Sequence, residues 1–244
     1  MTTLLALHGF TGSPDSWRFL AESASHWLAP SLIGHAGADA APQVSSFQDE
    51  VERLAAVASD AQPLHVIGYS LGARLALGIA LRYPERVARL TLVSGHPGLG
   101  SEAERRARRA ADGLWIALLL ERGLLAFLAA WEAQPLWASQ ARLAKSVRDR
   151  KRAERLTHDA PGLAHSLRVT GLAEMPNYAE RLAELRMPVQ LLAGELDPKF
   201  CALARTMAAH LSQPTLDIVP GAGHDLLLER PEFVTEVIRR GNQT

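Results

Sequence analysis

The chain has 244 residues, 48% of them hydrophobic and 21% charged, and its 26 Lys and Arg residues balance its 26 Asp and Glu residues. This length allows one globular domain whose core needs no disulfide, and the charge balance argues against a general binder of nucleic acid or of an anionic membrane. The single cysteine, Cys201, excludes an internal disulfide and indicates a reducing compartment. The N-terminus has no signal-peptide pattern, and no uninterrupted apolar run reaches about 18–20 residues. We therefore expect a cytoplasmic protein that is not bound to a membrane.

Short apolar runs alternate with helical patterns over the first hundred residues. Residues 36–46 are rich in Ala, Gly, Ser and Pro and are expected to form a loop. The expected strands are Leu4–Leu7, His26–Ala29, Leu64–Ile67 and Val87–Val93, and the expected helices begin at Pro14, Phe47 and Leu71. Strands separated by helices predict an α/β fold with a mainly parallel sheet and right-handed crossovers.

The alternation stops after residue 97, and only helical patterns follow as far as residue 186. Leu124, Phe127, Leu128 and Trp131 have the i, i+3, i+4, i+7 spacing of one helix face. We interpret residues 98–186 as a helical lid inserted between two strands of a core formed by residues 1–97 and 187–244. The strand pattern returns at 188–193 and 215–219, with helices expected at 200–211 and 231–240, which makes about six strands.

The segment Gly68-Tyr69-Ser70-Leu71-Gly72 joins an apolar strand directly to a helix. Gly-x-Ser-x-Gly in this context is typical of a nucleophile elbow, a tight turn that holds the serine oxygen clear of the sheet. A side chain at either glycine would collide with the neighbouring strand or helix. Ser70 is therefore the leading candidate for a catalytic residue.

A serine hydroxyl needs an imidazole to take its proton and a carboxylate to orient that imidazole. Asp197 follows the strand that ends near residue 193, although Glu195 competes for its role, and His224 follows the last expected strand. The order Ser70, Asp197, His224 is the one expected for this type of elbow. The backbone N–H groups of Leu71 and Phe10 are the candidates for an oxyanion hole.

Arg74 lies one helical turn after Ser70, so it can share the face that looks into the site. A guanidinium at that position suits a ligand with a carboxylate, which it can bind through two parallel hydrogen bonds. From position alone, a solvated or salt-bridged arginine is the commoner alternative. The arginine clusters of the expected lid make a role in binding an anionic ligand more credible.

With these residues placed, the chain resembles the α/β-hydrolase superfamily along nearly its whole length. Within it, the chain resembles the family of 2-succinyl-6-hydroxy-2,4-cyclohexadiene-1-carboxylate synthases of menaquinone biosynthesis. The matching motifs are Leu-His-Gly-Phe-Thr-Gly (7–12), Gly-Tyr-Ser-Leu-Gly-Ala-Arg (68–74), Ser-Gly-His-Pro-Gly-Leu (94–99), Trp-Glu-Ala-Gln-Pro-Leu-Trp (131–137) and Gly-Glu-Leu-Asp-Pro-Lys-Phe (194–200). The triad motifs are common to many hydrolases, whereas Arg74, Gly-His-Pro-Gly-Leu and Trp-x-x-Gln-Pro are more selective.

The resemblance implies a lyase without cofactor or metal, which eliminates pyruvate from 2-succinyl-5-enolpyruvyl-6-hydroxy-3-cyclohexene-1-carboxylate. It implies that the serine acts as a base on a ring proton and forms no acyl-enzyme. A small polycarboxylate would be the only partner, and the oligomeric state is not predicted. The substrate carboxylates would be held by Arg74, Arg108 and Arg155, and the pocket would be lined by Tyr69, Trp131 and Trp137.

Two departures from the family pattern affect these expectations. Asp225 follows the catalytic histidine where close relatives have Asn, and a carboxylate pointing into the site would repel an anionic substrate. The sequence also starts at the strand of the oxyanion loop, so we expect the leading antiparallel strands of the full fold to be missing.

Two other functions stay open. The same triad could serve a serine carboxylesterase or small-ester hydrolase, in which case Arg74 and the lid arginines would be incidental. A non-catalytic binding protein of the same fold is disfavoured because serine, acid and histidine are all present in the expected order.

Overall fold

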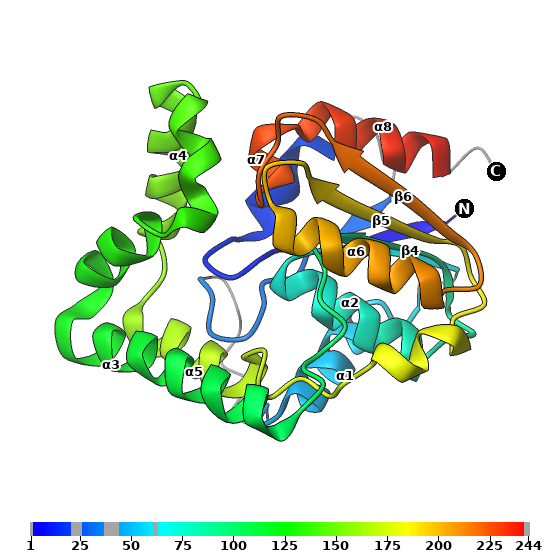
Figure 1. Cartoon of the computed structure of the whole chain (residues 1–244), viewed down its shortest axis with the longest axis horizontal. Coiled ribbons are helices and arrows are strands. Elements are labelled where there is room, and N and C mark those ends of the chain that lie inside the picture. The colour runs from blue at the N-terminus through cyan, green and yellow to red at the C-terminus, as the bar shows by residue number, and fades with distance from the viewer. Residues whose placement is uncertain (1, 21–25, 37–43, 61–62, 242–244) are drawn as a thin grey trace.

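One parallel sheet of six strands organises the computed structural model, which describes residues 2–20, 26–36, 44–60 and 63–241 (Figure 1). The strand order is β2-β1-β3-β4-β5-β6, and every strand pair is parallel. The prediction of about six mainly parallel strands is therefore confirmed. The strands are β1 (Thr3–Leu7), β2 (Trp27–Leu28), β3 (Leu64–Tyr69), β4 (Val87–Val93), β5 (Val189–Gly194) and β6 (Pro214–Val219).

Both faces of the sheet are covered by helices, which explains why its strands are nearly continuous apolar runs. In β1, Leu5 and Leu7 point into one hydrophobic cluster and Leu4 and Ala6 into the other, because successive side chains of a strand alternate between its faces. The first face packs against α1 (Phe47–Val57), α2 (Leu71–Arg82) and α6 (Pro198–His210); the second packs against the 3-10 helix η1 (Pro14–Leu20), α7 (Leu226–Glu229) and α8 (Pro231–Gly241) (Figure 1).

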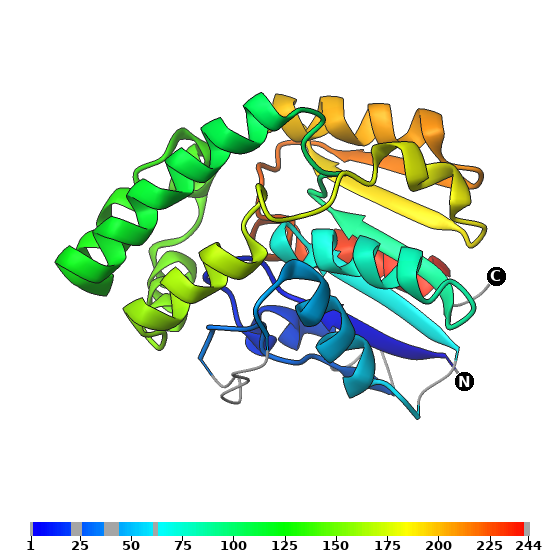
Figure 2. The same cartoon turned by 90° about the horizontal axis from the view of Figure 1, so that it is seen from below.

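A helical insertion, residues 98–186, separates β4 from β5. Its three α-helices lie together at one side of the sheet in both views, beyond the carboxyl ends of the strands (Figures 1 and 2). Phe127 and Leu128, two of the four residues with the predicted helical spacing, are buried where α3 packs on α5. The insertion contains α3 (Glu102–Glu132), the 3-10 helix η2 (Pro135–Arg142), α4 (Lys145–Arg155), α5 (Ala160–Thr170) and the 3-10 helix η3 (Ala179–Glu184).

Helix α3 is long and apolar enough, by length and composition, to cross a membrane. Its apolar run is interrupted by Glu121 and Arg122, so no uninterrupted apolar stretch of membrane-spanning length occurs within it. The helix is broken at Gly123, whose φ is 76°, and its inner side packs against α5. Water-soluble proteins contain helices of the same length and composition, so this match alone assigns no membrane span.

Other elements differ from the prediction in extent. The expected strand His26–Ala29 shrinks to Trp27–Leu28 at the edge of the sheet, and the helix that begins at Pro14 is a 3-10 helix. Helix α7 was not predicted, because four residues are too few to show a helical period. Most of the predicted loop 36–46 lies outside the described residues.

Candidate active site

The turn between β3 and α2 is strained, and it presents Ser70 at the carboxyl edge of the sheet. Ser70 has a φ of 51°, which non-glycine residues seldom adopt, so the surrounding structure must hold it there. A Cβ at Gly68 would meet the carbonyl of Gly72, and one at Gly72 would meet the carbonyl of Leu7. Glycine at both positions is therefore a condition for the tight turn.

Ser70, His224 and Asp197 form a hydrogen-bonded row although they come from three separate loops. The Ser70 hydroxyl lies 3.0 Å from Nε2 of His224, and Nδ1 of His224 lies 2.7 Å from Oδ2 of Asp197. Since a carboxylate can only accept, Nδ1 carries the proton and Nε2 is left to accept from the serine. This is the arrangement of a serine activated by a general base.

Asp197 and Glu195 have different roles. The other oxygen of Asp197 accepts from the N–H of Phe200 at the start of α6, which holds the buried carboxylate in place. Glu195 is exposed and accepts from the N–H of Gly221 at 2.8 Å. Of the two acids weighed from the sequence, the one next to the histidine is therefore Asp197.

Two backbone amides border the space in front of Ser70. The N–H of Leu71 is the first amide of α2, so it has no acceptor within the helix. Phe10 lies in a turn closed by a hydrogen bond of 3.0 Å from the N–H of Gly12 to the carbonyl of Gly9. Phe10 and Leu71 both line the same pocket as Ser70, as a pair of oxyanion-hole donors must.

The pocket at Ser70 has a volume of about 320 Å³ and lies between the sheet edge and the helical insertion. Its walls combine aromatic rings with a few charged groups, which is the usual composition of a small-molecule site. Among the predicted substrate-binding residues, those that line it are Tyr69, Arg74, Arg108, Trp131 and Trp137.

Arg74 reaches this pocket from the first turn of α2. Its Nη1 donates to the carbonyl of Thr170 at 2.8 Å, which leaves other N–H groups of the guanidinium for a ligand. Burial, and next the positive charge of Arg108, lower its pKa to about 9. The group is still charged at neutral pH, and a carboxylate in the pocket would relieve the cost of its burial.

Arg108 approaches the pocket from the first half of α3. Its Nε donates to both carboxylate oxygens of Asp112 at 2.9 Å, one helical turn further on. The side chain is 36% exposed, so it is held by one acid and otherwise faces solvent and the pocket. Arg74 and Arg108 thus bring two guanidinium groups to the same pocket.

Arg155 is not among the residues that line this pocket. Its side chain is 4% exposed, its Nη1 donates to Glu132 at 3.0 Å, and its guanidinium lies over the Trp137 ring. Arg155 therefore lies behind the aromatic wall, where it shares Glu132 with Arg152, and its role in substrate binding stays a prediction. Its place in the arginine cluster did not show which side of α4 faces the pocket.

Several pocket residues had no role assigned from the sequence, and three of them matter for the charge and shape of the site. They are His96, Lys199 and Phe200, all within motifs that carried the resemblance. Nδ1 of His96 accepts from the N–H of Gly98, and burial followed by the charge of Arg74 lowers its pKa to about 4. The pocket therefore contains a neutral imidazole at pH 7 and a third cation, Lys199, beside the two arginines.

Asp225 does not point into this pocket. It is buried and accepts from the N–H of Leu228, so it caps α7, and it faces a second cavity behind the oxyanion turn. Glu229, which the sequence analysis did not single out, accepts from the N–H of Gly223 and from the hydroxyl of Ser139. Burial raises the pKa of Glu229, and these contacts tie the loop before His224 to the helical insertion.

The fold and the sequence place the chain in a known class of proteins. The alpha/beta hydrolase family model matches residues 4–237, and the chain belongs to this family. Among solved structures, the TM-score is 0.93 with a structure of MenH from S. aureus, at 28% identity over 97% of this chain and 91% of that one. An esterase from Thermogutta terrifontis, at 24% identity and a TM-score of 0.84, shows the same fold.

Curated relatives narrow the class further. The putative 2-succinyl-6-hydroxy-2,4-cyclohexadiene-1-carboxylate synthase of Bacillus subtilis (strain 168) is 40% identical, over 96% of this chain and 88% of the relative. The synthase of the same name from Salmonella agona (strain SL483) is 34% identical, over 96% of this chain and 91% of its own length. The family resemblance inferred from the motifs is confirmed, and the chain is an enzyme, a lyase on an α/β-hydrolase scaffold.

Proposed function

We propose that the protein eliminates pyruvate from 2-succinyl-5-enolpyruvyl-6-hydroxy-3-cyclohexene-1-carboxylate and so forms 2-succinyl-6-hydroxy-2,4-cyclohexadiene-1-carboxylate in menaquinone biosynthesis. The observation that carries the proposal is one pocket that joins the Ser70–His224 pair to the guanidinium groups of Arg74 and Arg108. An esterase for neutral acyl groups has no use for two buried or half-buried cations beside its serine. The names of the relatives agree with this product.

In the proposed reaction, Ser70 is a base and not a nucleophile. The Ser70 hydroxyl passes its proton to Nε2 of His224 and removes the proton from the ring carbon next to the succinyl carbonyl. The resulting enolate oxygen would be stabilised by the N–H groups of Phe10 and Leu71. The electron pair then returns through the ring and expels enolpyruvate, which takes up the proton held by His224 and becomes pyruvate, so that the triad returns to its starting state. Asp197 stabilises the imidazolium formed in the first step.

The substrate has three carboxylates, and three cations line the pocket. Arg74, Arg108 and Lys199 would hold them by charge-assisted hydrogen bonds, and the aromatic side chains of Tyr69, Trp131 and Trp137 would pack against the ring. Because α3 and η2 carry one wall, the helical insertion would act as the lid of the site. The substrate is small and water-soluble, which agrees with the cytoplasmic location expected from the sequence.

The test compares two activities of the same preparation. Pyruvate release from the enolpyruvyl substrate, followed with lactate dehydrogenase and NADH, should be fast, and hydrolysis of p-nitrophenyl acetate should be slow. Rapid ester hydrolysis without pyruvate release would overturn the proposal in favour of the esterase. Both rates should depend on Ser70, so their ratio decides between the two functions.

A further inference from the structure

The turn formed by residues 9–12, here called the oxyanion turn, contains a non-glycine residue in a strained backbone conformation. Thr11 has a φ of 61°, a conformation that is costly for a β-branched side chain. Such strain persists only where neighbouring groups hold the backbone in place. Since Thr11 follows Phe10 directly, whatever holds Thr11 also sets the direction of the Phe10 N–H.

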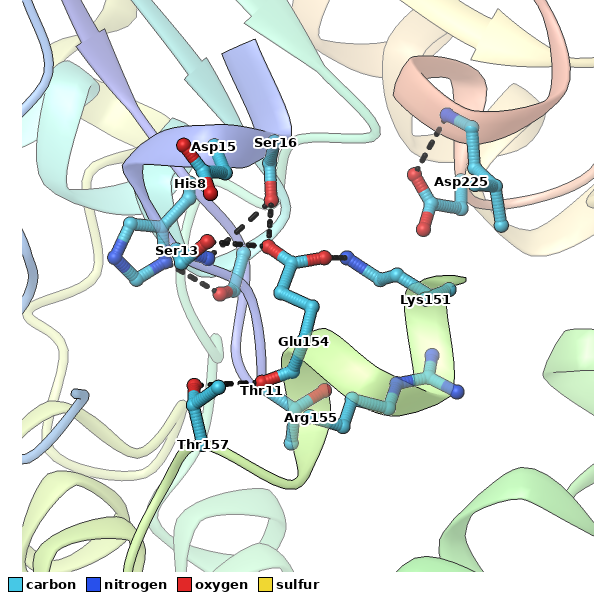
Figure 3. A network of polar contacts seen from close by, with 12 residues as sticks. His8, Thr11, Ser13, Asp15, Ser16, Lys151, Glu154, Arg155, Thr157 and Asp225 are labelled. Atoms are coloured by element: carbon cyan, nitrogen blue, oxygen red, sulfur yellow. Dashed lines mark hydrogen bonds and ion pairs between the residues drawn. The ribbon is translucent and has the colours of Figure 1, made fainter. Parts of the chain in front are cut away.

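The helical insertion supplies one of these holding groups through Glu154, in the last turn of α4 (Figure 3). Oε1 of Glu154 accepts from the hydroxyl of Ser13 at 2.5 Å and from that of Ser16 at 2.8 Å. Oε2 accepts from the ammonium of Lys151 at 3.0 Å. Ser16 in turn accepts from the N–H of Ser13 at 3.3 Å, so the carboxylate ends a short chain of hydrogen bonds that begins in the backbone.

Glu154 is ionised in this position. Burial by itself would raise its pKa, but the charge of Lys151 and the hydrogen bonds from Ser13, Lys151 and Ser16 outweigh that effect and lower the pKa. A charged acceptor makes stronger hydrogen bonds than a neutral one. The side chain is only 18% exposed, so solvent weakens these bonds little.

Helix α4 reaches the other elements mainly through this end. Within the described part of the chain, the hydrogen bonds that join α4 to other elements come from its last turn. Glu154 accepts from Ser13 and Ser16, just after the oxyanion turn, and Arg152 and Arg155 bind Glu132 of α3. In Figure 1 the rest of α4 stands away from the sheet. An ion pair with Lys151 alone could stabilise a surface helix. The contacts of Glu154 with Ser13 and Ser16 go beyond that, because they tie α4 to the chain next to the oxyanion turn.

A histidine of the loop after β2 binds Thr11 directly, and a histidine of the insertion supports that loop. Nε2 of His35 accepts from the N–H of Thr11 at 3.2 Å, and Nδ1 of His158 accepts from the N–H of Ala36 at 2.9 Å. The rings of His35 and His158 are in edge contact, with centroids 5.2 Å apart. Glu154 of the insertion therefore binds the chain just after the strained residue, whereas His158 reaches Thr11 through His35.

We propose that Glu154 is a positioning residue that holds the oxyanion turn in its working geometry, so that the Phe10 N–H points at the developing enolate. This inference rests on the proposed use of that N–H as an oxyanion donor. It makes the oxyanion hole of this enzyme depend in part on the helical insertion, through the carboxylate of Glu154 in α4.

The test measures kcat and KM for pyruvate release. Glu154→Ala should lower kcat about 10- to 100-fold, which stays below the loss of a whole oxyanion donor. KM should change less than about threefold, because the substrate carboxylates are held by other residues. Glu154→Gln should recover most of the loss, because its amide oxygen can still accept from Ser13 and Ser16. Asp149→Ala, at an exposed acid on the same helix, is the matched control and should behave as the wild type.

A second variant pair guards against misfolding. Ser13→Ala combined with Ser16→Ala removes the donors from the core side and leaves α4 unchanged, and it should reproduce the kcat loss of Glu154→Ala. A purely structural role would lower Tm without lowering kcat per folded molecule. A Glu154→Ala enzyme that is folded and keeps kcat within twofold of the wild type would overturn the inference.

Binding of a phenylboronic acid separates this inference from the proposed function. The boronate forms a reversible tetrahedral adduct on Ser70 whose oxygen occupies the oxyanion hole, and it needs no natural substrate. Weaker boronate binding by Glu154→Ala, even in an enzyme that releases no pyruvate, would support the positioning role while the proposed substrate fails. Equal binding by wild type, Glu154→Ala and Asp149→Ala would overturn the positioning role while leaving the substrate untouched.

Discussion

The two walls of the pocket are held by different means. Ser70, Asp197 and His224 sit in loops directly after β3, β5 and β6, and the register of buried parallel strands brings the three strand ends together. Arg108 and the tryptophans come from helices of the insertion, which pack mainly on one another. The proton-transfer groups are therefore placed by the sheet, whereas the position of the Arg108 guanidinium, which would bind a ligand carboxylate, depends on packing between helices.

The largest loss of activity is expected for a substitution of Ser70, in the wall built by the sheet. Ser70→Ala should reduce kcat for pyruvate release by on the order of 10³-fold or more, because no other group can take the substrate proton. Alanine has the same backbone preferences at this strained position, so circular dichroism and Tm should be close to those of the wild type. An unchanged rate in a folded variant would show that Ser70 is not the base.

Arg74 lies on the boundary between the two walls. Arg74→Ala should reduce kcat/KM by a factor that corresponds to about 2–4 kcal/mol of lost transition-state stabilisation. This is the cost of losing a charge-assisted pair in a partly buried site. Arg82→Ala, at an exposed arginine at the other end of α2, is the control and should leave kcat/KM unchanged. An effect of Arg74→Ala below a few tenths of a kcal/mol would remove Arg74 from the ligand site.

The pH dependence of stability should reveal the support beneath the oxyanion turn. His8 donates from Nδ1 to the carbonyl of Gly9 and accepts at Nε2 from the N–H of Leu32, so it must be neutral. Burial lowers its pKa from 6.5 to about 3. As the pH falls from 6.5 toward 3, the unfolded chain binds a proton that the folded chain refuses. The free energy of unfolding should therefore fall by up to about 1.4 kcal/mol per pH unit from this group.

Denaturant titrations between pH 7 and pH 4 measure this slope. Above pH 6.5 the contribution of His8 is fully present, so the slope from this group should vanish there. His8→Asn should flatten the curve in the acidic range, and His210→Asn, at an exposed histidine, should not. A His8→Asn variant with the slope of the wild type would mean that His8 does not titrate in this way.

The smallest effect is expected in the wall built by the insertion. Arg108 is partly exposed and already paired with Asp112, so Arg108→Ala should raise KM by about 5- to 10-fold, or roughly 1 kcal/mol. Arg106→Ala, at an exposed arginine of the same helix, should leave KM unchanged. A larger loss for Arg108 than for Arg74 would reverse the comparison and give the insertion the main role in binding.

Much of the core could be predicted because its signals are local. The strand Val87–Val93 and the helix that starts at Leu71 appear at the predicted residues, since each is a continuous apolar or helical pattern bounded by turn residues. The short edge strand and α7 could not be predicted with the same accuracy. Two-residue and four-residue elements depend on neighbours in space and show no period of their own.

The amino-acid sequence by itself determined the nucleophile elbow, the order of its partners and the alternating α/β pattern, because chain order and periodicity carry that information. Only the tertiary structure decided which arginines face the pocket: Arg108 lines it, and Arg155 pairs with Glu132 behind the tryptophans. It also brought Lys199 into the pocket and Glu154 to Ser13, just after the oxyanion turn. A charged residue on a helix can point in several directions, and packing between elements distant in sequence selects one of them.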